Sequence, residues 1–124
     1  MILLLLVEDE PAIRTMLEDS LAEEGFKLVL ARDGSQALAE LDADAARFRG
    51  VVTDISLGRG PTGWEVARRA RELVPEMPII YMTGGNAHEW AAQGVPKSVL
   101  VPKPFVPAQI ITAVSNLLNG GETS

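Results

Sequence analysis

Short apolar runs alternate with amphipathic segments along the whole chain. The runs that fit β-strands cover residues 2–7, 26–31, 51–54, 78–82 and 98–101. The segments that fit helices begin at Pro11 and, further on, cover 35–47, 64–73, 86–93 and 107–118. The first run has no polar alternation, which is typical of a strand buried on both faces. This order predicts a parallel sheet with helices on both of its faces.

Polar residues follow four of the five predicted strands. They are Glu8, Asp9 and Glu10 after the first strand, Asp54 at the end of the third, Thr83 after the fourth and Lys103 after the fifth. If these strands are neighbours in one parallel sheet, their carboxyl ends meet at one edge. Carboxylates, a hydroxyl and an ammonium group would then lie a few ångströms apart. Such a set suits metal-assisted transfer of a phosphoryl group to a carboxylate.

Each of these groups also has an ordinary structural interpretation. Glu8 and Asp9 fit a negative cap on a helix that starts at Pro11. Asp54 and Thr83 are both common in turns, and Lys103 can be a solvated charge. The arrangement as a whole favours the site, because four strand ends that each carry a required group are improbable by chance.

Composition limits the classes of function. The chain has 124 residues, 47% of them apolar, which fits one domain over residues 1–119 with a flexible tail over 120–124. Cysteine is absent, which excludes disulfides and thiolate sites, and the net charge of −6 argues against binding to nucleic acid or anionic membranes. The first apolar run is too short for a signal peptide or a membrane span, so we expect a cytoplasmic protein.

Four short motifs carry a family resemblance. They are Val-Glu-Asp-Glu-Pro at 7–11, Thr-Asp-Ile-Ser-Leu at 53–57, Tyr-Met-Thr-Gly at 81–84 and Lys-Pro-Phe at 103–105. In this order and spacing they resemble the receiver domain of two-component response regulators, over nearly the whole chain. The resemblance implies the flavodoxin-like α/β fold, a doubly wound (βα)5 domain with a five-stranded parallel sheet of order 2-1-3-4-5.

The resemblance also assigns roles. Asp54 would accept a phosphoryl group from the phosphohistidine of a histidine kinase or phosphotransfer protein. Asp9 and Asp54 would bind Mg²⁺ directly, and Glu8 would act through water. The backbone carbonyl of Ser56 would be the remaining protein ligand.

Two further residues complete the implied site. Thr83 would donate its hydroxyl to a phosphoryl oxygen, and Lys103 would pair with Asp54 and then with the phosphate. The Lys103–Pro104 peptide bond would be cis. The domain would be a phosphoacceptor and not an enzyme, apart from slow self-catalysed phosphorylation and dephosphorylation.

Leu100 is the clearest departure from the family pattern. Many receivers have Tyr or Phe at this position, three residues before the lysine, and its ring follows the movement of the threonine. We therefore expect the Thr83–Gly85 turn and the short helix after it to carry the conformational response. A similar departure occurs in a subgroup of single-domain receivers with a glycine-rich turn. Two smaller departures are Glu8, where Asp is commoner, and a loop over 58–63 that is one residue longer than usual.

Output is expected through protein contacts, because no effector domain follows residue 118. The expected surface for an unknown downstream protein covers residues 86–118. There Trp90 is either a contact residue or a core residue, and His88 is expected to be an ordinary surface residue. Trp64 is expected to pack in the core. A final set of residues is interpreted as a solvated helix face, with kinase docking as the alternative: Arg68, Arg69 and Arg71.

Two rival functions are weaker alternatives, and a third is excluded. A degenerate receiver would act as an unmodified interaction domain, but the retained Asp54, Thr83 and Lys103 argue against it. A phosphatase with an aspartyl nucleophile usually has a second Asp just after the first, whereas residues 55–57 are Ile, Ser and Leu. A dinucleotide-binding domain is excluded because no glycine-rich fingerprint follows Val7.

Overall fold

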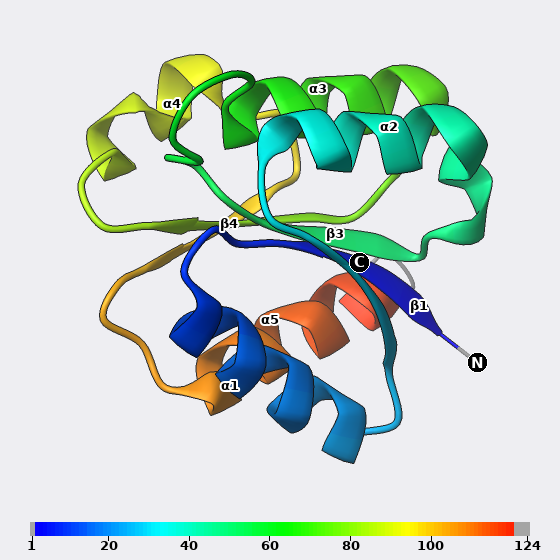
Figure 1. Cartoon of the computed structure of the whole chain (residues 1–124), viewed down its shortest axis with the longest axis vertical. Helices are drawn as coiled ribbons and strands as arrows, with labels where there is room; N and C mark the ends of the chain where they lie inside the picture. Colours follow the sequence, from blue (N-terminus) through cyan, green and yellow to red (C-terminus); the bar gives the residue numbers. More distant parts are fainter. Residues whose placement is uncertain (1, 121–124) are drawn as a thin grey trace.

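In the computed structural model, which describes residues 2–120, the chain forms a parallel five-stranded sheet. Figure 1 shows a layer of helices on each side of it. The strands are β1 (Leu3–Val7), β2 (Lys27–Ala31), β3 (Gly50–Asp54), β4 (Ile79–Thr83) and β5 (Val99–Pro102). Their order in the sheet is β2-β1-β3-β4-β5, with β2 and β5 at the edges. The predicted fold class and strand order are therefore confirmed.

Helices cover both faces of this sheet. They are α1 (Pro11–Glu23), α2 (Gly34–Asp44), α3 (Gly63–Leu73), α4 (Trp90–Gln93) and α5 (Pro107–Gly120), with 3-10 turns η1 (Ala45–Arg47) and η2 (Ala87–Glu89). Figure 1 shows α2, α3 and α4 on one side of the sheet and α1 and α5 on the other. The connections are those of a doubly wound fold, in which functional residues gather at the carboxyl ends of the strands.

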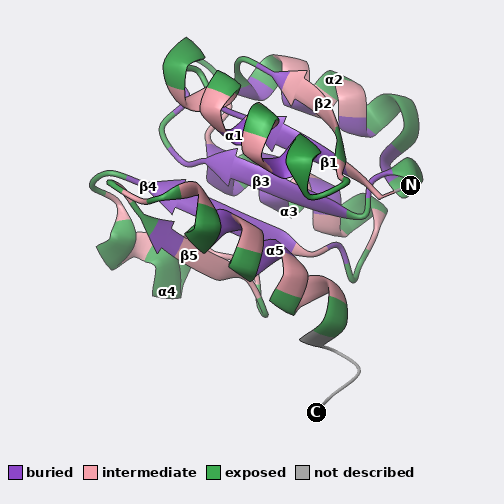
Figure 2. Ribbon diagram, turned by 90° about the horizontal axis from the view of Figure 1, so that it is seen from below, coloured by how far each residue is buried: buried purple, intermediate pink, exposed green. Residues whose placement is uncertain are grey.

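The unbroken apolar sequence of β1 follows from its position in the middle of the sheet. Alternate side chains of a strand point to opposite faces. Leu5 and Val7 therefore pack with the core on the α2–α3 side, and Leu4 and Leu6 pack with the core on the α1–α5 side. Figure 2 shows this burial along the central strands, with exposure concentrated on the outer helix surfaces.

Several element boundaries differ from the sequence prediction. The second predicted helix ends at Asp44 instead of Arg47, because the backbone of Asp44 (φ −169°) leaves the helical region and η1 follows. The segment predicted as one short helix, 86–93, is divided between η2 and α4. The last helix continues through Gly120, which the prediction placed in the tail, and 121–124 lie outside the described residues.

Gly63 brings the start of α3 against the end of β3. Its backbone N–H donates to the Ile55 carbonyl at 2.8 Å, and a Cβ at this position would collide with the carbonyl of Asp54. We expect Gly63→Ala to lower the free energy of unfolding by on the order of 2 kcal/mol, because the collision involves backbone that cannot move freely. Urea unfolding measures this loss.

Gly84→Ala is the matched control for that substitution. A Cβ on Gly84 would meet no heavy atom within 4 Å, so its effect on the free energy of unfolding is expected to stay within about 0.5 kcal/mol. Equal destabilisation by the two variants would contradict the close approach of α3 to Asp54.

The helices between residues 2 and 120 are all too short or too polar to cross a lipid bilayer.

Candidate functional site

Four strands end side by side along the carboxyl-terminal edge of the sheet, as the sequence predicts. The register pairs Val7 with Thr53, Asp54 with Met82 and Thr83 with Pro102. Beyond β5, the backbone N–H of Lys103 donates to the Thr83 carbonyl at 2.6 Å. The residues that follow β1, β3, β4 and β5 are thereby brought to neighbouring positions.

The ammonium group of Lys103 lies between two carboxylates. Its Nζ is 3.0 Å from Oδ2 of Asp54 and 3.2 Å from Oε1 of Glu8. Glu8 is fully buried and Asp54 is 5% exposed, so both ion pairs are shielded from bulk water. Shielding strengthens the attraction between the charges, and it makes the loss of one partner unfavourable. Lys103 therefore holds the carboxylates of β1 and β3 together.

Three carboxylates form one cluster at this edge. Glu8, Asp9 and Asp54 each offer an oxygen within 4.8 Å of the other two. Lys103 compensates only part of their negative charge, and oxygen donors at such distances fit a hard divalent cation. Both oxygens of Glu8 already have hydrogen-bond partners: Oε1 accepts from Lys103, and Oε2 accepts from the Glu10 backbone N–H at 3.1 Å. Asp9 is exposed and is the more accessible ligand.

Burial and charge change the protonation of this cluster. Burial, together with the charge of Asp54, raises the pKa of Glu8 to about 7, against a backbone hydrogen bond and Lys103, which lower it. Burial likewise raises the pKa of Asp54, although its hydrogen bond with Lys103 opposes the change. Burial alone lowers the pKa of Lys103, but Asp54 and Glu8 outweigh it, and the net pKa is raised. The lysine therefore stays charged, and a further cation would stabilise the ionised form of the carboxylates.

The raised pKa of Glu8 predicts how stability depends on pH in metal-free protein. Because the folded pKa, about 7, is above the ordinary value of 4.5, the contribution of Glu8 is full below pH 4.5 and is lost as pH rises through 7. We compare the free energy of unfolding of Glu8→Gln with that of wild type in EDTA. We expect the variant's value, relative to wild type, to be higher at pH 7.5 than at pH 4.5 by on the order of 2 kcal/mol. Urea unfolding of both proteins tests this. The same difference at both pH values would contradict it.

Thr83 ends β4 with its hydroxyl directed into a turn. The side chain is buried, and its Oγ1 accepts from the backbone N–H groups of Gly85 at 3.2 Å and Asn86 at 2.7 Å. The hydroxyl of Ser56, two residues after Asp54, donates to Oδ1 of Asn86 at 3.1 Å. The predicted metal-binding role of the Ser56 backbone carbonyl stays a prediction.

Sequence reasoning missed two residues at this edge. The sequence predicts Asn86 only as the start of a short helix, whereas it contacts both Thr83 and Ser56. Arg14 of α1 donates from Nη1 to the Glu8 carbonyl at 2.8 Å and fixes the backbone where β1 ends. The position of Asn86 directly after a Thr-Gly-Gly turn was an available signal for the first. Arg14 sits in a helix pattern and gave no such signal.

The family model for the response regulator receiver domain matches residues 4–115. The chain belongs to the response regulator receiver family. The family consists of the receiver domains of two-component signalling, which agrees with the resemblance of the four motifs. The Lys103–Pro104 bond of this receiver is cis, as that resemblance predicts.

Similar proteins support the assignment. A crystal structure of a response regulator receiver protein from Sinorhizobium medicae is 47% identical, with a TM-score of 0.91 over 95% of this chain and 94% of its own. TrrA from Thermotoga maritima, solved in complex with Mg²⁺–BeF, is 30% identical, with a TM-score of 0.81 over 94% of this chain and 99% of its own. The response regulator MprA of Mycolicibacterium vanbaalenii is 31% identical over 117 residues, which are 93% of this chain and 49% of MprA. The receiver thus spans about half the length of the curated relatives it matches.

Leu100 of this receiver packs beside a buried aromatic pair. Its partner in the neighbouring strand is Tyr81, whose ring meets the edge of Trp64 with centroids 4.7 Å apart. Trp64 is 5% exposed, so its predicted packing role is confirmed. The Tyr81 hydroxyl accepts from the Val95 backbone N–H at 3.1 Å, which ties β4 to the segment after α4. Burial raises the pKa of Tyr81.

The three arginines of α3 do not share one role, and the interpretation as a solvated face is wrong for Arg71. Its guanidinium donates to the carbonyls of Met77 and Pro96, each at 2.6 Å, and it contacts that of Lys97 at 3.5 Å. Arg68 donates to the side-chain and backbone oxygens of Gln93 in α4. Arg69 pairs on the surface with Asp42 and Glu72, as expected of a solvated residue.

The positions of Trp90 and His88 near α4 decide between the interpretations of these residues. Trp90 is 37% exposed, and its indole N–H donates to Oγ of Ser98 at 3.0 Å, so the core alternative is wrong. His88 is exposed, which confirms an ordinary surface position.

Proposed function

We propose that this receiver is a phosphoacceptor module that takes a phosphoryl group from the phosphohistidine of a histidine kinase or phosphotransfer protein onto Asp54. One observation supports this above all. Lys103 pairs with the buried carboxylate of Asp54 at 3.0 Å, within a cluster of three carboxylates. A lone acidic turn residue would have neither the buried ion pair nor the two neighbouring carboxylates.

The transfer needs one nucleophilic oxygen and compensation of charge. An Asp54 carboxylate oxygen attacks phosphorus, the phosphorus–nitrogen bond of the donor breaks, and the imidazole nitrogen keeps the electron pair and takes up a proton. Lys103 is placed to pair with a phosphoryl oxygen after the transfer, and Thr83 to donate its hydroxyl to another. Burial of Asp54 limits access of water to the acyl phosphate.

The carboxylate cluster fits Mg²⁺ by its donor chemistry. Asp9 and Asp54 would bind the ion directly, the Ser56 backbone carbonyl would add a third protein ligand, and Glu8 would act through water. Both Glu8 oxygens have hydrogen-bond partners within the protein, which supports its indirect role. Bound Mg²⁺ supplies positive charge to the transferred phosphoryl group. The Mg²⁺–BeF complex of the similar protein TrrA supports the same choice of ion.

The rival functions lack support at this site. A degenerate receiver would have no need of the buried Lys103–Asp54 ion pair. A phosphatase needs a general acid near its nucleophile, and Ser56 instead donates its hydroxyl to Asn86. We propose that the receiver is not an enzyme beyond slow self-catalysed reactions of the acyl phosphate, and that it works in the cytoplasm beside its kinase.

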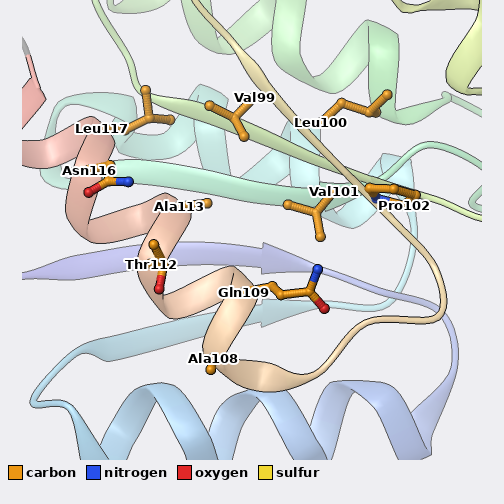
Figure 3. A pocket seen from close by; sticks show the side chains of 10 residues that line it. All are labelled: Val99, Leu100, Val101, Pro102, Ala108, Gln109, Thr112, Ala113, Asn116 and Leu117. Atoms are coloured by element: carbon orange, nitrogen blue, oxygen red, sulfur yellow. The ribbon is translucent and has the colours of Figure 1, made fainter.

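Output is proposed through the surface formed by residues 86–118, which would bind a downstream protein. A pocket of about 530 Å³ lies on this surface between β5 and α5 (Figure 3). Apolar side chains such as Val101 and Leu117 line it, with the polar Gln109 and Asn116 beside them. An apolar pocket with a few polar groups suits the insertion of a partner side chain. The net charge of −6 argues against binding of nucleic acid or of an anionic membrane by this domain.

Trapping the phosphorylated residue tests the function. We expect a small phosphodonor such as acetyl phosphate, with Mg²⁺, to add one phosphoryl group, which borohydride reduction and peptide mass spectrometry locate at Asp54. Omission of Mg²⁺ is expected to suppress labelling. Labelling of another residue, or none with a competent kinase, would favour the unmodified interaction domain.

A further inference from the structure

Asn86 lies where three parts of the receiver meet. Its backbone N–H donates to Oγ1 of Thr83 at 2.7 Å, its Oδ1 accepts from Oγ of Ser56 at 3.1 Å, and its Nδ2 donates to Oε1 of Glu89 at 3.0 Å. Thr83 ends β4, Ser56 belongs to the loop after Asp54, and Glu89 belongs to η2, directly before α4. One residue therefore joins both loops of the site to the helical segment beyond them, to Thr83 through its backbone N–H and to Ser56 and Glu89 through its side chain.

The bonds to Thr83 determine what its hydroxyl can still do. A hydroxyl has two acceptor positions and one donor proton. The N–H groups of Gly85 and Asn86 use the acceptor positions of Oγ1, so its proton is available for donation. Thr83 is also next to Met82, whose strand partner is Asp54. The turn thus holds the hydroxyl as a donor at the end of the strand beside Asp54.

The two glycines of this turn are open to solvent, so hydrogen bonds have a large share in holding it. Gly84 and Gly85 are exposed, and a Cβ on either would meet no heavy atom within 4 Å. Two glycines in sequence give the backbone many accessible conformations. The side-chain bonds of Asn86 to Ser56 and Glu89 limit that freedom. The position of the Thr83 hydroxyl therefore depends on a residue that does not itself contact the phosphoacceptor.

We propose that Asn86 is a positioning residue with two separable links. The Ser56 link fixes the Thr83 turn against the loop that carries Asp54, and so sets the rate of phosphoryl transfer. The Glu89 link joins the same turn to α4, and so transmits the modification of Asp54 to Trp90. This inference rests on the proposed phosphoacceptor function. It gives the response a path that needs no aromatic side chain at Leu100.

Two measurements separate the links. The rate of Asp54 labelling by acetyl phosphate with Mg²⁺, followed by mass spectrometry, reports the first link. The second is read from 19F NMR of protein that contains 5-fluorotryptophan, because the chain has two tryptophans and gives two signals. Trp90→Phe assigns the signals. In wild type, labelling of Asp54 is expected to shift the Trp90 signal and to leave the buried Trp64 signal in place.

The variants then follow a distinct pattern. Asn86→Ala is expected to slow labelling about fivefold, which corresponds to the loss of one hydrogen bond, and to abolish the Trp90 shift. Glu89→Ala removes the acceptor of the Asn86 Nδ2 but leaves the Ser56 link, so labelling is expected at nearly the wild-type rate without the shift. A residue that only stabilised the fold would move both measurements together.

The outcomes distinguish the inference from the proposed function. If wild type labels at Asp54 but Asn86→Ala keeps both the rate and the Trp90 shift, the positioning role is overturned and the phosphoacceptor function stands. If Glu89→Ala is as slow as Asn86→Ala, the separation into two links is overturned. If wild type does not label at all, both proposals fail. Thermal melting of each variant shows that the comparison is made on folded protein.

Discussion

Asp54→Asn is expected to abolish incorporation of a phosphoryl group from either a small donor or a kinase. An amide oxygen is a poor nucleophile, so we expect labelling to fall by at least about a hundredfold. The substitution keeps the shape of the side chain, and the Asn oxygen can still accept from Lys103. Because burial raises the pKa of Asp54, the removal of its charge is not expected to unfold the protein. Phosphoryl incorporation measured by intact-protein mass spectrometry checks the effect.

The control for this variant is Asp42→Asn. Asp42 has the same chemistry but lies on the surface, where it pairs with Arg69 at 2.9 Å. Its replacement is expected to leave labelling at the wild-type level. Persistent labelling of Asp54→Asn, with the phosphoryl group mapped to Asp9 or another acid, would contradict the assignment of the phosphoacceptor.

Asp9→Ala is expected to weaken Mg²⁺ binding by at least about tenfold, because Asp9 is exposed and is proposed as a direct ligand. Glu8→Gln is expected to weaken it by only about threefold, because Glu8 is engaged with Lys103 and the Glu10 N–H and is proposed to act through water. Isothermal titration of the unphosphorylated protein with Mg²⁺ measures both affinities.

Glu10→Gln serves as the control for those two variants. Glu10 is adjacent in sequence and exposed, but it is not one of the three acids whose oxygens cluster within 4.8 Å. Its replacement tests the effect of a lost negative charge without a lost ligand, and little change is expected. Equal weakening by Asp9→Ala and Glu8→Gln would contradict the division into a direct and a water-mediated ligand.

The sheet and the main site residues could be predicted because the strands are recognisable in the sequence and the site residues stand at their carboxyl ends. A buried parallel strand is a short apolar run, and its carboxyl end is the point where the run stops. Glu8, Asp54, Thr83 and Lys103 all directly follow or close such a run, so the strand order alone brings them together. Boundaries were less predictable where the chain leaves regular geometry, as at Asp44.

The contacts between loops could not be predicted in this way. The bond between Ser56 and Asn86 joins residues 30 positions apart, and those from Arg71 to Pro96 and Lys97 join residues 25 and 26 apart. Such bonds depend on the paths of irregular segments, which leave no period in the sequence. A helical arginine whose partners are backbone carbonyls looks, in sequence, like any solvated arginine.

Those arginine contacts limit how far α4 can travel. The segment that contains α4 is anchored before its start, where Thr83 binds Asn86, and after its end, where Tyr81 holds Val95 and Arg71 holds Pro96. With both ends of the segment held, α4 can rotate or tighten, but it cannot move by displacing residues of β5. The outer surface of α4 is therefore expected to accept substitutions that retune partner choice while the chemistry around Asp54 remains the same.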